Sequence, residues 1–348
     1  MDGFFLEYRD PLFSLIVFFF LIFMVTFIAY LWGRYKRKED YKNLNKFLQQ
    51  FQVTSQEDPL SSQIKDGVLS RNLWLMLADA YFKNGAYEKA IEIYHELLHM
   101  QGQKDLQNIM FLLGKTYFKA GFLERSKQTF LELLHYAPRN AKALHYLLLV
   151  YEYMKEYKHA LEVLEPLDEL QEDIMLEKEY LNVRILLDNP KIDVEKKVSE
   201  LAKIYRNSQK LVYMIFEYIF RVDPKKGWEL LNLEDAIYII DILWNLERND
   251  INFDIIANDD FLQQLYTAKG YIKSVQHSDI LELDILIQLQ EKDIANLSFS
   301  YTCSSCKTVA PFPFYRCSSC HNIATIDVEY MLCKNYFRGM SEENNSFQ

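Results

Sequence analysis

The most apolar stretch of the chain lies near its N-terminus. From Leu12 to Trp32 there are 21 residues without a charged side chain, and at 1.5 Å per residue a helix of this length spans about 30 Å, the thickness of a bilayer core. The pattern predicts a transmembrane helix at 12–32. A cleaved signal peptide would need a basic start, whereas acidic residues precede this run. A buried helix of a soluble core, the other alternative, rarely lacks a polar stripe over this length.

Basic residues on the two sides of this helix predict its orientation. Arg9 precedes it, and the basic residues that follow are Arg34, Lys36, Arg37, Lys38, Lys42 and Lys46. Lysine and arginine close to a membrane helix stay on the cytoplasmic side. We therefore expect a short periplasmic segment at 1–11 and a cytoplasmic C-terminal body. Residues 33–66 predict a juxtamembrane helix and a linker, because helical periodicity gives way there to a segment rich in Ser, Asp and Pro.

Three segments beyond the linker superpose without gaps, beginning at Trp74, Met110 and Leu144. Equivalent positions carry Tyr81, Tyr117 and Tyr151, the small residues Ala90, Ser126 and Ala160, and the large residues Tyr94, Phe130 and Leu164. A recurrence of about 34 residues is typical of stacked helix pairs, and small residues let two helices cross closely. Residues 67–173 therefore resemble three tetratricopeptide repeats. Lys155 replaces the glycine seen at Gly85 and Gly121, so the turn of the third repeat is expected to differ.

From 174 to 297 the apolar pattern stays helical, but the repeat signature fades. Six amphipathic helices are expected, within residues 177–188, 195–206, 209–222, 234–246, 259–272 and 279–290. Because a helix pair needs a stacked neighbour to bury its apolar face, we expect these helices to extend the array as degenerate repeats. The predicted fold class is all-α: a transmembrane helix, a tetratricopeptide-repeat solenoid and a small C-terminal module.

The first helix of each repeat predicts a partner-binding face. The candidate groove residues are Leu75, Phe82, Lys83, Phe111, Lys115, Phe118, Lys119 and Tyr153, and the same face should carry Asp79, His145, Leu149 and Glu152. Aromatic residues alternating with lysines suit a peptide that is part apolar and part acidic. The alternative is that Phe82 and Phe118 pack between neighbouring repeats.

Four of the five cysteines stand in two Cys-Ser-Ser-Cys pairs, Cys303 with Cys306 and Cys317 with Cys320. Two such knuckles can bring four sulfurs around one ion, and a reducing cytoplasm disfavours disulfides. We expect one structural metal ion, zinc or else iron, in a rubredoxin-like or zinc-ribbon module at 298–328, followed by a tail at 329–348. A thioredoxin-type redox pair is the weaker alternative, because no helix pattern follows the cysteines.

The residues around these cysteines refine the expectation. Lys307 and His321 follow the second cysteine of each pair, where such knuckles commonly carry glycine, which predicts weaker backbone N–H to sulfur bonds but the same ligands. Lys307 and Arg316 are expected to offset part of the negative charge of the site. His321 is interpreted as a neighbour of the site, and Cys333 as a thiol that binds no metal.

Composition and motifs limit the possible functions. The formal net charge of −10 and the isoelectric point near 5.3 argue against nucleic acid as the main partner, because binding there depends on neutralising phosphates. The sequence contains no phosphate-binding loop, His-Glu-x-x-His motif or nucleophile elbow. We therefore predict a protein that binds other proteins, with no enzymatic activity and no small-molecule substrate.

A membrane anchor, a helical-repeat array and a four-cysteine knuckle, in this order, resemble the lipopolysaccharide assembly protein B family of Gram-negative inner membranes. The ten-residue gap between the cysteine pairs, Tyr315-Arg316 before the second pair and the segment CSSCHNIATI add to this resemblance. It implies a single-pass adaptor that links a membrane-bound AAA+ protease of the FtsH type to the deacetylase LpxC, which commits carbon to lipid A. It also implies that the knuckle packs against the repeats.

Two alternatives to an adaptor stay open at this point. The first is a membrane-anchored assembly factor or chaperone for an envelope or secretion complex, whose groove would hold a subunit. The second is an oxidoreductase that uses the Cys-Ser-Ser-Cys pairs, whose thiols would cycle rather than stay bound to metal.

Overall fold

The computed structural model describes residues 71–99, 105–292 and 294–334, together with the isolated residues Met24 and Phe27. The predicted periplasmic segment, transmembrane helix and juxtamembrane segment therefore lie outside the described residues, apart from those two positions. The end of the predicted tail, 335–348, also lies outside them. Within the part that is described, no helix is both long and apolar enough to cross a membrane.

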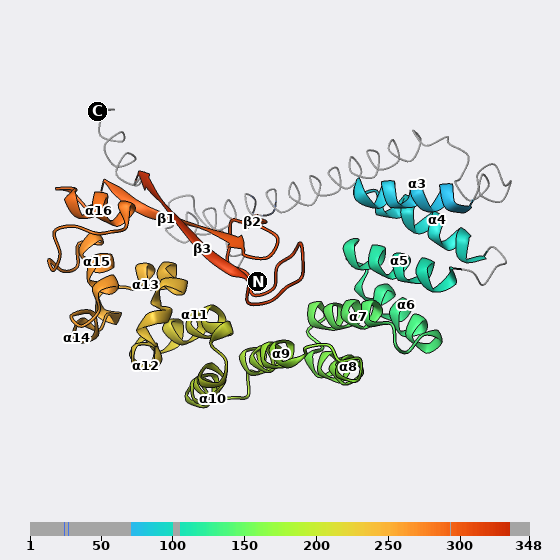
Figure 1. Ribbon diagram of the computed structural model, residues 1–348, viewed down its shortest axis with the longest axis horizontal. Helices are drawn as coiled ribbons and strands as arrows, with labels where there is room; N and C mark the ends of the chain where they lie inside the picture. The colour runs from blue at the N-terminus through green and yellow to red at the C-terminus, as the bar shows by residue number, and fades with distance from the viewer. Residues whose placement is uncertain (1–23, 25–26, 28–70, 100–104, 293, 335–348) are drawn as a thin grey trace, which may run out of the picture. The chain divides into compact units, whose positions relative to one another are not determined.

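The described chain is mostly helical, as the sequence predicted, but it ends in a small sheet (Figure 1), so the predicted all-α class holds for the helical array and not for the C-terminal module. The helices of the repeat region are α3 (Arg71–Lys83), α4 (Tyr87–His99), α5 (Leu106–Lys119), α6 (Leu123–Tyr136), α7 (Ala141–Tyr153) and α8 (Tyr157–Glu169). The chain divides into two compact units within α5, the first ending at Thr116 and the second beginning at Tyr117.

The small residues that the repeat alignment placed at the helix crossings are buried. Ala90 in α4, Ser126 in α6 and Ala160 in α8 are each fully buried. The large residues four positions further along, Tyr94, Phe130 and Leu164, are also buried. Burial of these positions is what the repeat pattern requires, because a small side chain lets another helix approach closely and a large one fills space in the core.

The turn of the third repeat has the same conformation as the first two, which corrects the expectation for Lys155. Its φ is 60°, close to the 76° of Gly85 and the 82° of Gly121. The backbone hydrogen bond is also the same: Lys155 N–H donates to the carbonyl of Glu152 at 2.9 Å, and Gly121 N–H donates to Phe118 at 3.1 Å. Packing of the helix pair therefore holds a lysine in the left-handed region that favours glycine.

Replacing Lys155 by glycine is expected to stabilise the protein by about 1 kcal/mol, because a Cβ atom costs about that much in the left-handed region. The thermal midpoint, followed by circular dichroism, should rise by a few degrees. Lys155→Ala keeps the Cβ atom and should leave the midpoint unchanged. Equal stabilisation by alanine and glycine would show that the lysine side chain, rather than the backbone, is responsible.

The second half of the array is less regular than its first repeats. Its α-helices are α9 (Met175–Asp188), α10 (Val194–Asn207), α11 (Val212–Val222), α12 (Pro224–Leu230), α13 (Ile240–Asn245), α14 (Phe253–Ile256), α15 (Asp260–Ala268) and α16 (Leu281–Gln288), with 3-10 turns η1 (Gln209–Leu211), η2 (Leu233–Ile239) and η3 (Arg248–Asp250). Four of the six expected helices appear as single α-helices. The segment 234–246 divides into η2 and α13, and η1 precedes α11. The short helices α12 and α14 were not foreseen.

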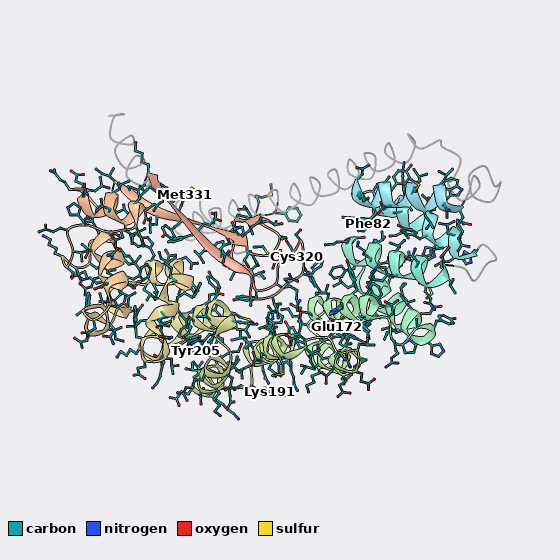
Figure 2. All side chains as sticks on the ribbon, viewed as in Figure 1. Phe82, Glu172, Lys191, Tyr205, Cys320 and Met331 are labelled. Atoms are coloured by element: carbon teal, nitrogen blue, oxygen red, sulfur yellow. The ribbon has the colours of Figure 1, made fainter. Side chains whose placement is uncertain are left out.

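A three-stranded antiparallel sheet closes the described chain, with the strand order β2-β1-β3. Its strands are β1 (Ala295–Cys303), β2 (Val309–Ala310) and β3 (Ile326–Lys334). The register runs from Cys303 opposite Ile326 to Ala295 opposite Lys334. Strand β3 thus continues six residues past the boundary expected at 328. In Figure 2, Cys320 marks the knuckle end of this module and Met331 lies toward the other end.

Candidate metal centre

The structure brings the four predicted cysteines together. Cys303 is the last residue of β1, Cys306 is the last residue of the turn after it, and Cys317 and Cys320 lie between β2 and β3. All four sulfur atoms lie within 4.8 Å of one another. The Cys303–Cys320 and Cys306–Cys317 sulfur pairs are 3.7 and 3.6 Å apart. Four sulfurs at about 2.3 Å from one ion would be about 3.8 Å apart in a tetrahedron, so the cluster is arranged to bind a metal ion.

The two knuckles have the same backbone geometry despite lacking glycine. Lys307 and His321 have φ angles of 59° and 64°, so each adopts the conformation that glycine favours. Lys307 N–H donates to the Cys303 carbonyl at 2.8 Å, and His321 N–H donates to the Cys317 carbonyl at 2.9 Å. The backbone N–H groups of Thr308 and Asn322 still donate to the sulfurs of Cys306 and Cys320. Lys307 and His321 therefore adopt the left-handed backbone conformation that glycine favours, and the N–H to sulfur hydrogen bonds are retained.

Electrostatics within the cluster favour a bound cation. The Thr308 hydroxyl, 3.2 Å from the Cys306 sulfur, and the Thr308 backbone N–H lower the pKa of Cys306 to about 6. Burial, together with hydrogen bonds among the cysteines, raises the pKa of Cys320 to about 12. Four thiolates at this separation repel one another, whereas a divalent ion stabilises all four in the charged form that binds metal.

Arg316 ties the second knuckle to the repeat helices. Its Nε donates to Glu152 of α7 at 2.6 Å, and its two terminal nitrogens donate to Glu177 of α9 at 3.1 and 2.7 Å. The Arg316 side chain is only 6% exposed. One terminal nitrogen also donates to the His321 carbonyl at 2.7 Å, which closes the knuckle loop. The guanidinium therefore binds the acids of two helices, a role that the sequence did not indicate.

Two tyrosine contacts reinforce this attachment. The Tyr315 hydroxyl donates to Glu217 of α11, and the Tyr180 hydroxyl of α9 donates to Glu152. Neighbouring residues 315 and 316 thus reach three helices of the array. Because Cys317 follows directly, the backbone that presents a metal ligand also carries the docking side chains.

Strand β1 is attached to the helices through a second buried carboxylate. Asp241 of α13 accepts hydrogen bonds from the hydroxyls of Tyr213 at 2.6 Å and Tyr301 at 2.9 Å. Burial raises the pKa of Asp241, and the two hydroxyls compensate for part of its lost hydration. The Trp244 indole N–H donates to Asn296 at 2.9 Å. Both ends of β1 are therefore held against the array.

The candidate groove residues fall in both units. In the first unit Leu75, Phe82, Phe111 and Lys115 are half-buried and Lys83 is exposed. The Lys115 ammonium lies 5.0 Å from the centre of the Phe82 ring, and Lys83 pairs with Asp79 at 2.6 Å. In the second unit Phe118 is buried, Lys119 is half-buried and Tyr153 is exposed. Glu152, expected on the partner-facing side, is instead bound to Arg316.

Two of the remaining predictions concern the neighbours of the cysteines. His321 follows Cys320 in the second knuckle, and its ring centre lies 5.8 Å from that of Phe118 and 6.3 Å from that of Tyr146. Cys333 lies in β3 opposite Asn296 and outside the group of four sulfurs.

Comparison of the chain with protein-family models and with curated proteins gives no match. The functional argument therefore rests on the residues of this chain.

Proposed function

We propose that this protein is a non-enzymatic adaptor of the bacterial inner membrane, anchored by residues 12–32 with its repeat body in the cytoplasm. In this proposal it brings a client protein to a membrane protease of the FtsH type. The client is the lipid A deacetylase LpxC, so the protein regulates lipopolysaccharide synthesis by promoting proteolysis of that enzyme.

The attachment of the four-cysteine knuckle to three repeat helices supports this proposal. Arg316 and Tyr315 bind Glu152, Glu177 and Glu217, so the knuckle and the helices α7 to α11 form a connected body. The resemblance to the lipopolysaccharide assembly protein B family implies the same packing. A rigid surface of this kind suits an adaptor, since less ordering entropy is lost on binding.

The metal has a structural role in this proposal. Four cysteine sulfurs complete a tetrahedral coordination shell and leave no position for water or substrate. We assign the ion as zinc, and iron suits the same ligands. The ion would fix the loop that carries Arg316 and so keep the knuckle against the helices.

The membrane anchor acts through effective concentration. An anchored adaptor beside an anchored protease makes the second encounter nearly intramolecular, which can raise the encounter rate about 10²–10⁴-fold without new contacts. No catalytic residue is required for this effect.

Loss of this protein is therefore expected to lengthen the half-life of the deacetylase in cells, measured by immunoblotting after translation is stopped. A variant lacking residues 1–32 should fold, keep its metal and bind the client, yet fail to restore rapid turnover. The same half-life with and without the protein would exclude the adaptor function. Pull-down in detergent would then test the assembly-factor alternative. An assembly factor should recover structural subunits in place of protease and deacetylase.

A further inference from the structure

Strand β3 forms an edge of the three-stranded sheet. It pairs with β1 on one side, and no strand in the described part of the chain pairs with its other side. In an antiparallel pair, every second residue directs its backbone N–H and C=O away from the partner strand. The free side of β3 therefore presents a row of backbone donors and acceptors that an added strand can use.

There is open space at both ends of this edge. At its start, a pocket of about 320 Å³ is lined by Ile326 and Asp327, together with Tyr238 of η2. Toward its end, the side chain of Met331 is 55% exposed (Figure 2). An extended segment therefore has room to reach both ends of the strand.

The side chains of β3 alternate between two environments. Asp327 and Glu329 are exposed on one face of the sheet. Val328 and Tyr330, on the other face, are half-buried, and Val328 lies opposite the buried Tyr301 of β1. A strand added to this edge would continue both faces, because directly opposite residues of neighbouring strands share a face. Its own residues would therefore alternate between partners for the carboxylates and partners for the apolar row.

The two exposed carboxylates of the edge are unpaired. Neither Asp327 nor Glu329 forms a hydrogen bond or an ion pair with any residue that the structure describes. Opposite charges on neighbouring strands stabilise a sheet, and like charges directly opposite destabilise it. The edge therefore favours basic residues at alternate positions of an added strand. It disfavours an acidic segment and also a second copy of β3, which would bring the same carboxylates together.

The charges around the edge also favour a basic partner. Four thiolates exceed the charge of one divalent ion, and Arg316 is matched by both Glu152 and Glu177. Beside the strand, the acids outnumber the cations: the acids are Asp235, Glu282, Asp327 and Glu329, and the cations are Lys210, Lys307 and Lys334. The surroundings of the edge are therefore net negative.

We infer that the free edge of β3 binds an extended segment of a partner protein in which lysine or arginine alternates with apolar residues. The segment adds a strand to the sheet through backbone hydrogen bonds. Its basic side chains pair with Asp327 and Glu329, and its apolar side chains extend the row that contains Val328 and Tyr330. This surface adds a partner to the proposed adaptor and does not depend on the adaptor function.

Fluorescence anisotropy with the full-length protein in non-ionic detergent tests this inference. The probe is a short fluorescein-labelled peptide that alternates lysine and valine, and it should bind. Two control peptides should bind at least about tenfold more weakly, one with glutamate in place of lysine and one with the lysines and valines grouped in two blocks. Equal binding of the grouped peptide would show that net charge alone is responsible and would overturn the inference.

Charge variants locate the binding surface. Asp327→Asn combined with Glu329→Gln should weaken binding of the lysine–valine peptide about tenfold, the effect of losing two cross-strand charge pairs. The matched control, Glu165→Gln with Glu169→Gln, removes two exposed carboxylates of α8 and should leave binding unchanged. Equal weakening by both double variants contradicts the inference. Metal content and circular dichroism confirm that each variant is folded.

Reversal of the two charges gives a second test on the same residues. Asp327→Lys combined with Glu329→Lys should make the glutamate–valine peptide bind better than the lysine–valine peptide, because the cross-strand pairs are restored with opposite signs. An unchanged preference for the lysine peptide would show that the peptide does not bind beside these residues.

Backbone methylation tests strand pairing directly. In an extended peptide, the N–H groups of the lysines point to one edge and those of the valines to the other. N-methylation of one set should abolish binding, because those N–H groups donate to β3, and N-methylation of the other set should not. Equal binding of the two methylated peptides would overturn the pairing.

The outcomes also distinguish other occupants and the adaptor function. Dissociation of a dimer by the Asp327 and Glu329 substitutions, measured by analytical ultracentrifugation, would identify a second copy as the occupant and overturn the inference. Peptide binding at β3, with a deacetylase half-life that does not depend on this protein, would support the edge and exclude the adaptor. Dependence of that half-life on the protein, without binding of the lysine–valine peptide, would support the adaptor and exclude the edge.

Discussion

Replacing Arg316 by methionine is expected to lower the free energy of unfolding by about 3–5 kcal/mol, the cost of breaking a buried ion pair by removing one partner. The guanidinium is nearly inaccessible to water and donates hydrogen bonds to Glu152 and Glu177. Methionine preserves much of the volume of the side chain but leaves the Glu152 carboxylate, 8% exposed, without its cation. The buried charge that remains, rather than lost packing, is the main source of the destabilisation.

Urea unfolding followed by circular dichroism measures this loss. The matched control is Lys203→Met, which removes the exposed pair of Lys203 with Glu200 and should cost less than about 0.5 kcal/mol, as exposed ion pairs do. Adding Glu152→Gln to Arg316→Met should recover part of the loss, since no buried charge is then left unpaired. A loss below about 1 kcal/mol for Arg316→Met would mean that this ion pair does not hold the knuckle in place.

Local and periodic features were predictable from the sequence. The repeat alignment placed Ala90, Ser126 and Ala160 at the helix crossings, and all three are fully buried. The cysteine spacing identified the four residues that cluster. In both cases the structural requirement acts within one helix pair or one short loop, so it leaves a regular pattern along the chain.

Contacts between distant segments were not predictable in the same way. Glu152 and Arg316 are 164 positions apart. In the sequence, Glu152 is an ordinary charged residue of an amphipathic helix, and Arg316 is an ordinary charged residue of a loop. The helical period placed Glu152 on the partner-facing side, and that side is where the knuckle binds. Only the fold brings the two charges together, so neither their pairing nor their burial has a local signal.

Two structural features that differ from the sequence predictions nevertheless have a recognisable pattern in the sequence. The alternation of apolar and polar residues in Ile326-Asp327-Val328-Glu329-Tyr330 is typical of a strand and predicts β3 beyond residue 328. The conformation of Lys155 follows from its alignment with Gly85 and Gly121, because the same turn requires the same backbone angles whichever residue occupies it.

Substituting Cys317 by serine should have the largest effect of all, because metal binding supplies most of the folding free energy of so small a module. Structural zinc sites contribute roughly 10–16 kcal/mol in isolated zinc-finger peptides. The unaltered protein should contain about one zinc or iron ion per chain, measured by plasma mass spectrometry, and Cys317→Ser should contain almost none. Metal-free unaltered protein, with four thiols that react freely, would exclude the metal site.

Cys333→Ser is the matched control for this substitution, since that thiol lies outside the cluster and its loss should leave the metal content unchanged. Amide hydrogen exchange shows which strands and helices are destabilised when the metal is lost. In Cys317→Ser the amides of β1 and β3 should lose protection, and α7 and α9 should exchange faster as well, because the released loop no longer presents Arg316 to Glu152 and Glu177. The helices α3 and α4 belong to the other unit and should exchange as before. Faster exchange confined to the sheet would show that the metal stabilises the module alone, whereas the spread to α7 and α9 is expected only if the ion also maintains the docking of the knuckle on the repeats.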